Sequence, residues 1–158
     1  MNSAGETAVC VGGFHTHATG LQSFVGGGQG SEASGAGSVV CGGTGNKAEG
    51  LLSFVGGGGV AEGSTLGNHA ASDFSTVCGG RINRALSECS VVCGGDSNRA
   101  WSSYSAIVGG AGNSADNFAF IGGGRLNEAE TYAVCGGGWY NEATGEGTGF
   151  KFSLEQVP

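Results

Sequence analysis

The segment Ser75–Ala85 reads STVCGGRINRA, and its pattern, SxVxGGxxNxA, recurs along almost the whole chain. Successive copies start 15, 15, 15, 22, 15, 15, 14 and 14 residues apart, and the long interval holds seven additional residues between Gly58 and Asn68. Self-similarity at a short fixed period indicates a chain that coils, with each unit packing mainly on its neighbours. The nine copies begin at Ala8, Ser23, Ser38, Ser53, Ser75, Ser90, Ser105, Ala119 and Ala133.

Composition alone would suggest a different kind of protein. The 158 residues include 36 Gly and 1 Pro, and Gly-rich chains without a period are usually disordered. Here the glycines keep the register of the repeat, so we expect an ordered array. A formal net charge of −7 with only 6 Lys and Arg argues against nucleic-acid binding, which needs a basic surface.

Membrane insertion is not expected either. No apolar run approaches the roughly 20 residues that span a bilayer. The first seven residues have neither the basic start nor the apolar segment of an export signal.

Each copy has the composition of one coil of an all-β fold. Phe74–Cys78 is rich in apolar and β-branched residues, about five long, and ends in Gly-Gly, which predicts a strand and a turn. Asn83–Ala85 predicts a second, shorter strand. Two strands and two bends in about 15 residues predict a parallel β-roll or β-solenoid of about nine turns, spaced about 4.8 Å apart. We assign residues 1–7 to a cap or join, 8–143 to the roll, with an insertion at 59–67, and 144–158 to a cap or connector.

Alternation along the strands predicts which side chains face the interior. The residue between Asn and Ala is charged or polar in every copy, so Asn and Ala should point inward, where Asn can form a ladder of hydrogen bonds. The Ser and Val positions of the first strand should oppose them. The turn and ladder residues expected in the most regular copies are Gly42, Gly43, Asn46, Ala48, Gly79, Gly80, Asn83, Ala85, Gly94, Gly95, Asn98 and Ala100.

The other face of the first strand is also apolar. Where Phe occupies it, as at Phe24, Phe54 and Phe120, the residue two positions later is Gly, a compensation of size that suggests packing. A strand that is apolar on both faces is buried on both faces, and a thin coil has only one interior. We therefore expect this stripe to contact another chain. Its residues are Phe24, Val39, Phe54, Phe74, Val91, Tyr104, Phe118, Phe120 and Tyr132.

Five of the six cysteines lie at the apolar strand positions, which predicts small core residues. They are Cys10, Cys41, Cys78, Cys93 and Cys135. No Cys/His spacing typical of a zinc site occurs. In-register strands would place Cys78 and Cys93 close enough for a disulfide, but we prefer reduced thiols, which favour assembly in a reducing cytosol.

The pattern SxVxGGxxNxA resembles the head repeats of YadA-like trimeric autotransporter adhesins over residues 8–143. The resemblance implies a left-handed parallel β-roll, three copies of which pack around a common axis in an adhesive head. Similar repeats occur in bacteriophage tail fibres and spikes, which assemble in the host cytoplasm without an export signal, and this context fits the cysteines better. The resemblance therefore implies a homotrimer that binds a bacterial cell-surface polysaccharide or protein, on a virion tail fibre or, alternatively, on a bacterial outer surface.

No catalytic or cofactor site is expected. Neither a Ser/His/acid set nor paired acids in one groove can be identified, so a depolymerising enzyme is the weakest hypothesis. A structural spacer or self-assembling filament subunit is the main alternative to receptor binding. His15 and His17 are the sole metal candidates: in an extended segment they would share a face, and three chains would bring six imidazoles together.

Binding is expected at loops and exposed aromatic residues. An insertion that interrupts a uniform rod is a natural place for recognition, although a neutral insertion is nearly as good an interpretation. Aromatic residues in the joins and bends could contact saccharide or simply cover an edge of the roll. The candidates are Val60, Ala61, Glu62, Ser64, Thr65, Trp101, Trp139 and Tyr140.

Overall fold

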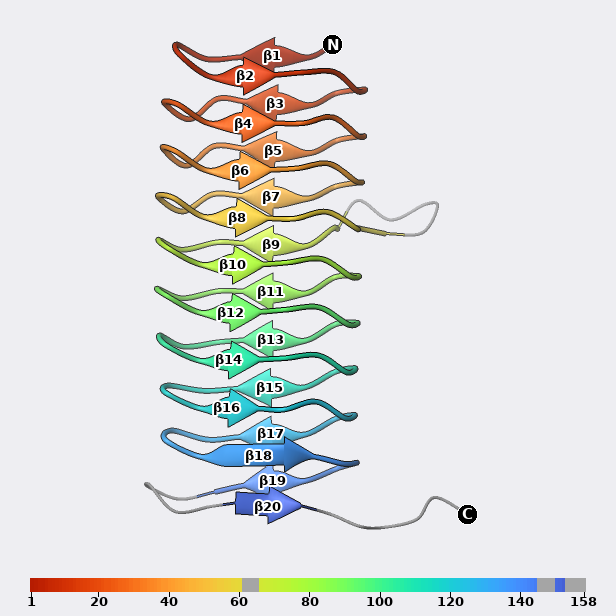
Figure 1. The fold of residues 1–158 in the computed structure, drawn as a ribbon, viewed down its shortest axis with the longest axis vertical. Helices are drawn as coiled ribbons and strands as arrows, with labels where there is room; N and C mark the ends of the chain where they lie inside the picture. The colour runs from red at the N-terminus through yellow and green to blue at the C-terminus, as the bar shows by residue number, and fades with distance from the viewer. Residues whose placement is uncertain (61–65, 145–149, 153–158) are drawn as a thin grey trace.

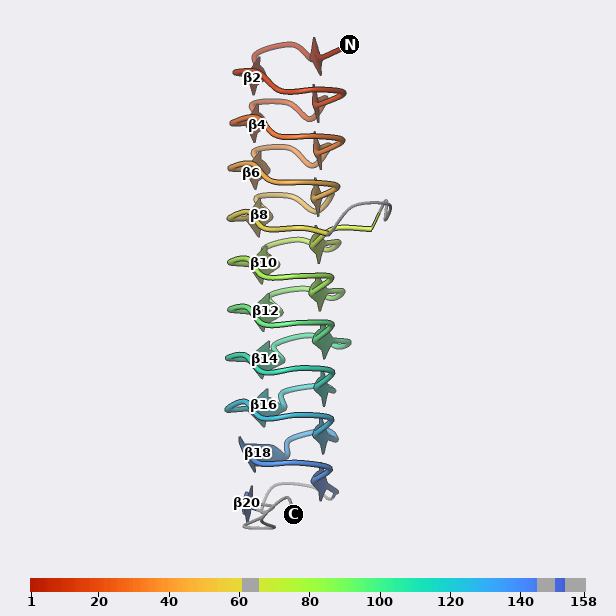
Figure 2. The same cartoon turned by 90° about the vertical axis from the view of Figure 1, so that its right-hand side faces the viewer.

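The computed structural model describes residues 1–60, 66–144 and 150–152, and within them it is an all-β parallel solenoid of about nine turns. Figures 1 and 2 show a straight rod with β1 at one end and β20 at the other. No helix able to cross a membrane lies in this part of the chain. The strands are β1 Ser3–Ala4, β2 Val9–Cys10, β3 His17–Ala18, β4 Phe24–Val25, β5 Glu32–Ala33, β6 Val39–Val40, β7 Lys47–Ala48, β8 Phe54–Val55, β9 His69–Ala70, β10 Thr76–Val77, β11 Arg84–Ala85, β12 Val91–Val92, β13 Arg99–Ala100, β14 Ala106–Ile107, β15 Ser114–Ala115, β16 Phe120–Ile121, β17 Glu128–Ala129, β18 Val134–Gly137, β19 Glu142–Ala143 and β20 Phe150–Phe152.

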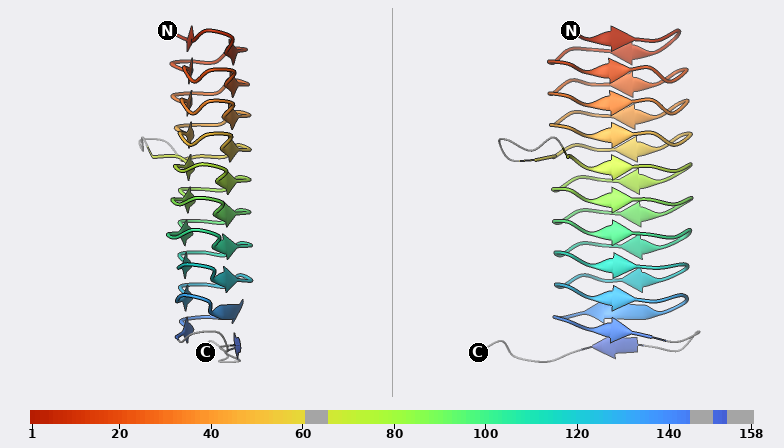
Figure 3. Two further views of the ribbon diagram at one scale, coloured as in Figure 1. Left: turned by 90° about the vertical axis from the view of Figure 1, so that its left-hand side faces the viewer. Right: turned by 180° about the vertical axis from the view of Figure 1, so that it is seen from behind.

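The strands form two facing ten-stranded sheets. The odd-numbered strands make one sheet, called sheet A here, and the even-numbered strands make the other, sheet B. Every pair of neighbours is parallel and belongs to consecutive coils, as Figure 3 shows from two further sides. The register survives the insertion, because Lys47 of β7 pairs with His69 of β9, 22 positions later.

The interior is lined by the four columns that the alternation predicts. The Ala of sheet A is fully buried in every copy, and Val, Ile or Cys faces it from sheet B, fully buried from Val25 onward. The Ser and Asn columns are buried beside them. Two sheets this close leave room for only a methyl group opposite Val, which explains why the Ala position does not vary between copies.

The buried asparagines form a continuous hydrogen-bonded ladder. Asn98 Nδ2 donates to the carbonyl oxygen of Gly94 in its own coil at 2.9 Å and to that of Gly110 in the next coil at 3.0 Å. Its Oδ1 accepts from the backbone N–H of Asn113 at 3.0 Å. Because each amide satisfies groups in two coils, the ladder ties the stack together along its axis.

The buried hydroxyls of the serines that open the copies of the motif are hydrogen-bonded in one half of the rod and, within the described structure, unpaired in the other, and this difference gives a prediction. Ser90 Oγ donates to the carbonyl oxygen of Ser87 at 2.5 Å, whereas Ser38 Oγ is buried and has no partner among the described residues. We therefore expect Ser90→Ala to lower the free energy of unfolding by about 1 kcal/mol and Ser38→Ala to leave it unchanged or raise it. Urea unfolding of the two variants measures this difference. Equal losses would show that the Ser90 hydrogen bond does not contribute.

The bends at both edges of the rod use left-handed backbone. The second Gly of each Gly-Gly pair has φ between 76° and 104°. At Gly95 a Cβ would lie 2.1 Å from the carbonyl oxygen of Gly110 in the next coil, so glycine is required for close stacking as well as for φ. At the opposite edge, the residue before the Ser position has φ between 51° and 65° in all nine copies, although only Gly37 among these is glycine.

This second set of bends corrects the expected strand boundaries. Phe74–Cys78 was expected to be one strand of about five residues, but β10 contains only Thr76 and Val77. Phe74 has a φ of 58° and is therefore a bend residue. The strands are short because both edges must turn within about 15 residues, which leaves few extended positions per coil.

Sheet A starts before the first complete copy of the motif. β1 pairs with β3, with Ser3 opposite His17 and Ala4 opposite Ala18. Asn2 Oδ1 accepts from the N–H of Thr16 at 3.2 Å, and its Nδ2 donates to the Gly13 carbonyl oxygen at 2.9 Å, so Asn2 makes the same kind of contact to the next coil as the ladder asparagines. At the other end, β20 extends sheet B by pairing with β18.

Candidate interaction surfaces

The outer side of sheet B and the bends that lead into its strands carry the predicted apolar stripe. We define the apolar face as the nine side chains proposed from the sequence: Phe24, Val39, Phe54, Phe74, Val91, Tyr104, Phe118, Phe120 and Tyr132. None of the nine is buried within the single chain, and Phe74, Tyr104, Phe118, Phe120 and Tyr132 are each 40% exposed or more. The structure thus leaves this stripe facing outward without a cover from the described part of the chain.

Three of its aromatic rings form a stack along one edge. Tyr104 and Phe118 have ring centroids 5.0 Å apart at 10°, and Phe118 and Tyr132 have theirs 5.1 Å apart at 9°. All three residues are at the left-handed bend position, so the backbone places their rings one above another at the coil spacing. The sequence identified these residues as apolar but gave no sign of the stacking.

The compensation of size next to Phe is present at two of the three predicted pairs, and at both it lies within one chain. A Cβ on Gly26 would lie 3.3 Å from Cε1 of Phe24, and a Cβ on Gly56 would lie 3.3 Å from Cε1 of Phe54. Each ring therefore leans over the glycine that directly follows its own strand. This flattens the face and leaves Phe24 and Phe54 half-buried before any second chain arrives.

The cysteines do not all lie in the core as expected. Cys135 is buried and Cys10 is half-buried, but Cys41, Cys78 and Cys93 are exposed. The reason is a difference of one position: Cys10 and Cys135 occupy the inward Val position, whereas the other three follow it and point outward from sheet B. The structure contains no disulfide among the six cysteines.

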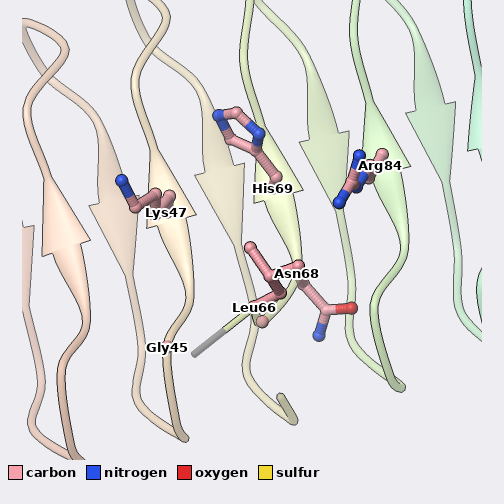
Figure 4. Close-up of a pocket in the computed structure, with 7 residues that line it drawn as sticks. Gly45, Lys47, Leu66, Asn68, His69 and Arg84 are labelled. Atoms are coloured by element: carbon pink, nitrogen blue, oxygen red, sulfur yellow. The ribbon is translucent and has the colours of Figure 1, made fainter. Parts of the chain in front are cut away.

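The outer side of sheet A is charged. His69 Nε2 lies 2.9 Å from Glu49 Oε2, and Lys47 Nζ lies 3.6 Å from Glu49 Oε1 and 3.7 Å from Glu32 Oε2. Burial raises the pKa of Glu49, but the hydrogen bond and charge of His69 and the charge of Lys47 outweigh it, so the pKa is lowered overall. Of these side chains, Lys47 and His69 line a pocket of about 40 Å³ together with Leu66 and Arg84 (Figure 4), a volume suited to a water molecule or a small ion rather than a sugar ring.

An ion pair between consecutive coils gives a pH prediction. Hydrogen bonding from the Arg81 guanidinium lowers the pKa of Asp96, and the Ser97 hydroxyl lowers it further. Stability from this pair is present above the ordinary aspartate pKa and is lost as the pH falls through the lowered value. In an NMR titration of the carboxyl group we expect Arg81→Gln to raise the Asp96 pKa, with Arg125→Gln as the control. An unchanged value would contradict the pairing.

The exposed aromatic candidates do not converge on one site. Trp101 extends from sheet A and is 48% exposed, with the Arg99 guanidinium carbon 5.9 Å from its ring centroid. Trp139 and Tyr140 lie together three coils away, with ring centroids 5.2 Å apart at 52°. Val60 is half-buried at the start of the insertion. The candidates Ala61, Glu62, Ser64 and Thr65 lie outside the described residues.

The histidine pair does not have the geometry assumed for a metal site. His15 has a φ of 53° and stacks on Phe14 at 4.1 Å, so the segment is bent rather than extended. His17 Nδ1 lies 2.7 Å from Ser3 Oγ on sheet A. In the described ranges no group of three or more His, Cys, Asp or Glu side chains is placed to hold a metal ion.

A scan against protein-family models and a search of curated proteins both find no match to this chain. The resemblance to YadA-like head repeats therefore stays a prediction from the motif. What the structure itself supplies is a β-solenoid with one apolar and one charged outer face.

Proposed function

We propose that three copies of this chain associate through the apolar face of sheet B and form the rigid head or shaft of a non-enzymatic attachment protein. The observation that carries the proposal is the apolar face, which continues over most of the coils of a straight rod. Exposed apolar patches of this length on a regular surface are typical of protein interfaces.

The free energy gained by burying the apolar face is of the size that assembly requires. Burying what remains exposed of one such side chain contributes about 1 kcal/mol, so nine residues contribute on the order of 10 kcal/mol per chain. Association costs about 4–15 kcal/mol in lost translational and rotational freedom. A trimer buries the face of three chains, on the order of 30 kcal/mol, against this cost taken twice, about 8–30 kcal/mol, so burial equals or exceeds the cost.

We further propose that the assembly belongs to a phage or phage-like tail fibre and binds a bacterial cell-surface polysaccharide or protein. A bacterial outer-surface adhesin is the alternative setting. Three exposed thiols and the resemblance to fibre repeats support the first. Recognition is assigned to the insertion at 59–67 or to an end of the rod, because the coils themselves are nearly uniform.

A purely structural spacer or filament subunit is the second candidate. The observation in its favour is the uniformity of the coils, whose strands keep one register from β1 to β19. Whole-cell binding that disappears on deletion of residues 59–67 would support recognition. Binding that survives the deletion would move recognition elsewhere, and no binding to any bacterial surface would favour the spacer.

The first experiment is the solution mass by light scattering, with and without reductant. We expect three times the chain mass of 15.4 kDa in both conditions. A monomer, or a trimer that dissociates with reductant, would overturn assembly through the apolar face.

A further inference from the structure

Two exposed thiols stand side by side on sheet B. β10 and β12 are neighbours in parallel register, with Val77 opposite Val92, and Cys78 and Cys93 directly follow this pair. The N–H of Cys78 donates to the Val92 carbonyl oxygen at 3.0 Å, so the parallel pairing continues through the cysteine positions. Both thiols are exposed, and both belong to the column that borders the Gly-Gly bends, away from the aromatic stack.

The spacing of the strands suits a bridging cation. Side chains of equivalent residues on neighbouring strands stand roughly parallel, about 4.7–4.9 Å apart. Metal–thiolate bonds are about 2.3 Å long, as in zinc sites, so an ion held linearly between two thiolates keeps the sulfurs no more than about 4.6 Å apart. The same spacing also lies within the Cα–Cα range of about 4.4–6.8 Å that a disulfide accepts. In the structure, however, Cys78 and Cys93 are both free thiols, so the pair is available to a cation.

We propose that Cys78 and Cys93 form a two-thiolate site for a single soft monovalent cation of the Cu(I) class. Thiolates select such cations over harder ones, and Cu(I) accepts linear coordination by two ligands. In the described ranges no third His, Cys, Asp or Glu joins the pair, which disfavours the four-coordinate site that Zn²⁺ requires.

Loading the site releases protons. Each thiol loses its proton as its sulfur bonds the cation, so two protons leave and two thiolates with one Cu(I) carry a net charge of −1. Partial burial raises the pKa of the Cys78 thiol, and the adjacent Cys93 raises it further. Binding therefore competes with protonation, and the affinity for Cu(I) rises as the pH rises toward the pKa of the thiols.

Cys41 provides a matched control within the same chain. It occupies the same column and is also exposed, but its neighbours in the coils before and after are Gly26 and Gly56. It is therefore a thiol of the same surface without a second sulfur beside it. If the site needs two thiols, removing the Cys41 thiol should not affect Cu(I) binding, whereas removing the Cys78 or the Cys93 thiol should.

The test is an anaerobic titration of the reduced full chain with a Cu(I)–acetonitrile complex against a chromogenic Cu(I) chelator. We expect one tightly bound cation per chain and thiolate-to-copper absorption in the near ultraviolet. Cys78→Ser and Cys93→Ser should each weaken the affinity about 10²–10⁴-fold, the gain that a second tethered ligand provides. Cys41→Ser should leave it unchanged. Unchanged circular-dichroism melting curves would establish that the serine variants are folded.

Several results would overturn the site. One is an equal loss of affinity in Cys41→Ser and Cys78→Ser, which would mean independent single thiols. Another is tight binding that survives in the double variant Cys78→Ser/Cys93→Ser. A third is uptake of the cation only with formation of a larger assembly, which would place the bridge between chains. Because none of these readouts depends on receptor binding, the metal site and the attachment function succeed or fail separately.

Discussion

Replacing Asn98 with alanine is expected to lower the free energy of unfolding by about 2–4 kcal/mol. The substitution removes the acceptor of the buried Asn113 N–H and the side-chain donor to the Gly94 carbonyl oxygen. The Gly110 carbonyl oxygen loses one donor but keeps the N–H of Asp96 at 2.9 Å. Buried groups left without a partner cost more than the hydrogen bond contributed, so the loss exceeds that of a surface asparagine.

Urea unfolding followed by circular dichroism measures this loss. The matched control is Asn117→Ala, because Asn117 is half-buried at an edge of the rod and, among the described residues, takes part only in a backbone hydrogen bond, from the Tyr132 N–H to its carbonyl oxygen. We expect the control to stay within about 0.5 kcal/mol of the parent chain. A similarly small change in Asn98→Ala would show that the ladder does not hold the coils together.

The aspartate variant separates the two roles of the amide. Asn98→Asp keeps an acceptor for Asn113 but sets a buried carboxylate against the carbonyl oxygens of Gly94 and Gly110. Burial raises the pKa of such a group, so its neutral form is favoured in the folded state. The stability of this variant relative to the parent should therefore increase as the pH falls. No pH dependence would indicate that the site is open to water.

The interior of the rod could be predicted from sequence because it repeats. One charged column, from His17 through Lys47 and Arg84 to Glu142, was enough to place Asn and Ala inward, and both columns are buried in the structure. A single copy would not have sufficed, since a two-residue strand such as Arg84–Ala85 carries no alternation of its own. The regular spacing also predicted the register, which continues across the insertion.

The surface was harder to predict because neighbouring positions look alike in sequence. Cys78 and Cys135 differ by one place in the motif, and this places one outside the roll and the other inside it. Phe74 is an aromatic residue of a type that is common in strands. In the structure it lies at a left-handed bend, a conformation that is needed only because the coil must close. Asn2–Ala4 is half a copy, too short to recognise without the hydrogen bond from the Thr16 N–H that ties Asn2 to the next coil.

Replacing Phe120 with aspartate is expected to convert the proposed trimer into a monomer. Phe120 lies on β16 in the apolar face, is 40% exposed in the single chain, and would be covered in the assembly. The substitution removes an apolar contribution of about 1–2 kcal/mol from each chain. It also places three carboxylates in the interface, and each costs several kcal/mol to desolvate without a partner. Summed over three chains, these losses are on the order of 10–20 kcal/mol, comparable to the margin by which the face outweighs the cost of association.

The matched control for this change is Trp101→Asp. Trp101 is an exposed aromatic residue of similar accessibility, at 48%, but it extends from the opposite sheet. Both variants gain one negative charge and lose one large apolar side chain. They differ only in whether the changed residue lies on the apolar face or on the opposite sheet. Light scattering should give the mass of one chain for Phe120→Asp and of three for Trp101→Asp, with similar circular dichroism for both. If only Trp101→Asp dissociates the trimer, the interface lies on sheet A. If both variants dissociate it, added charge rather than the apolar face controls assembly.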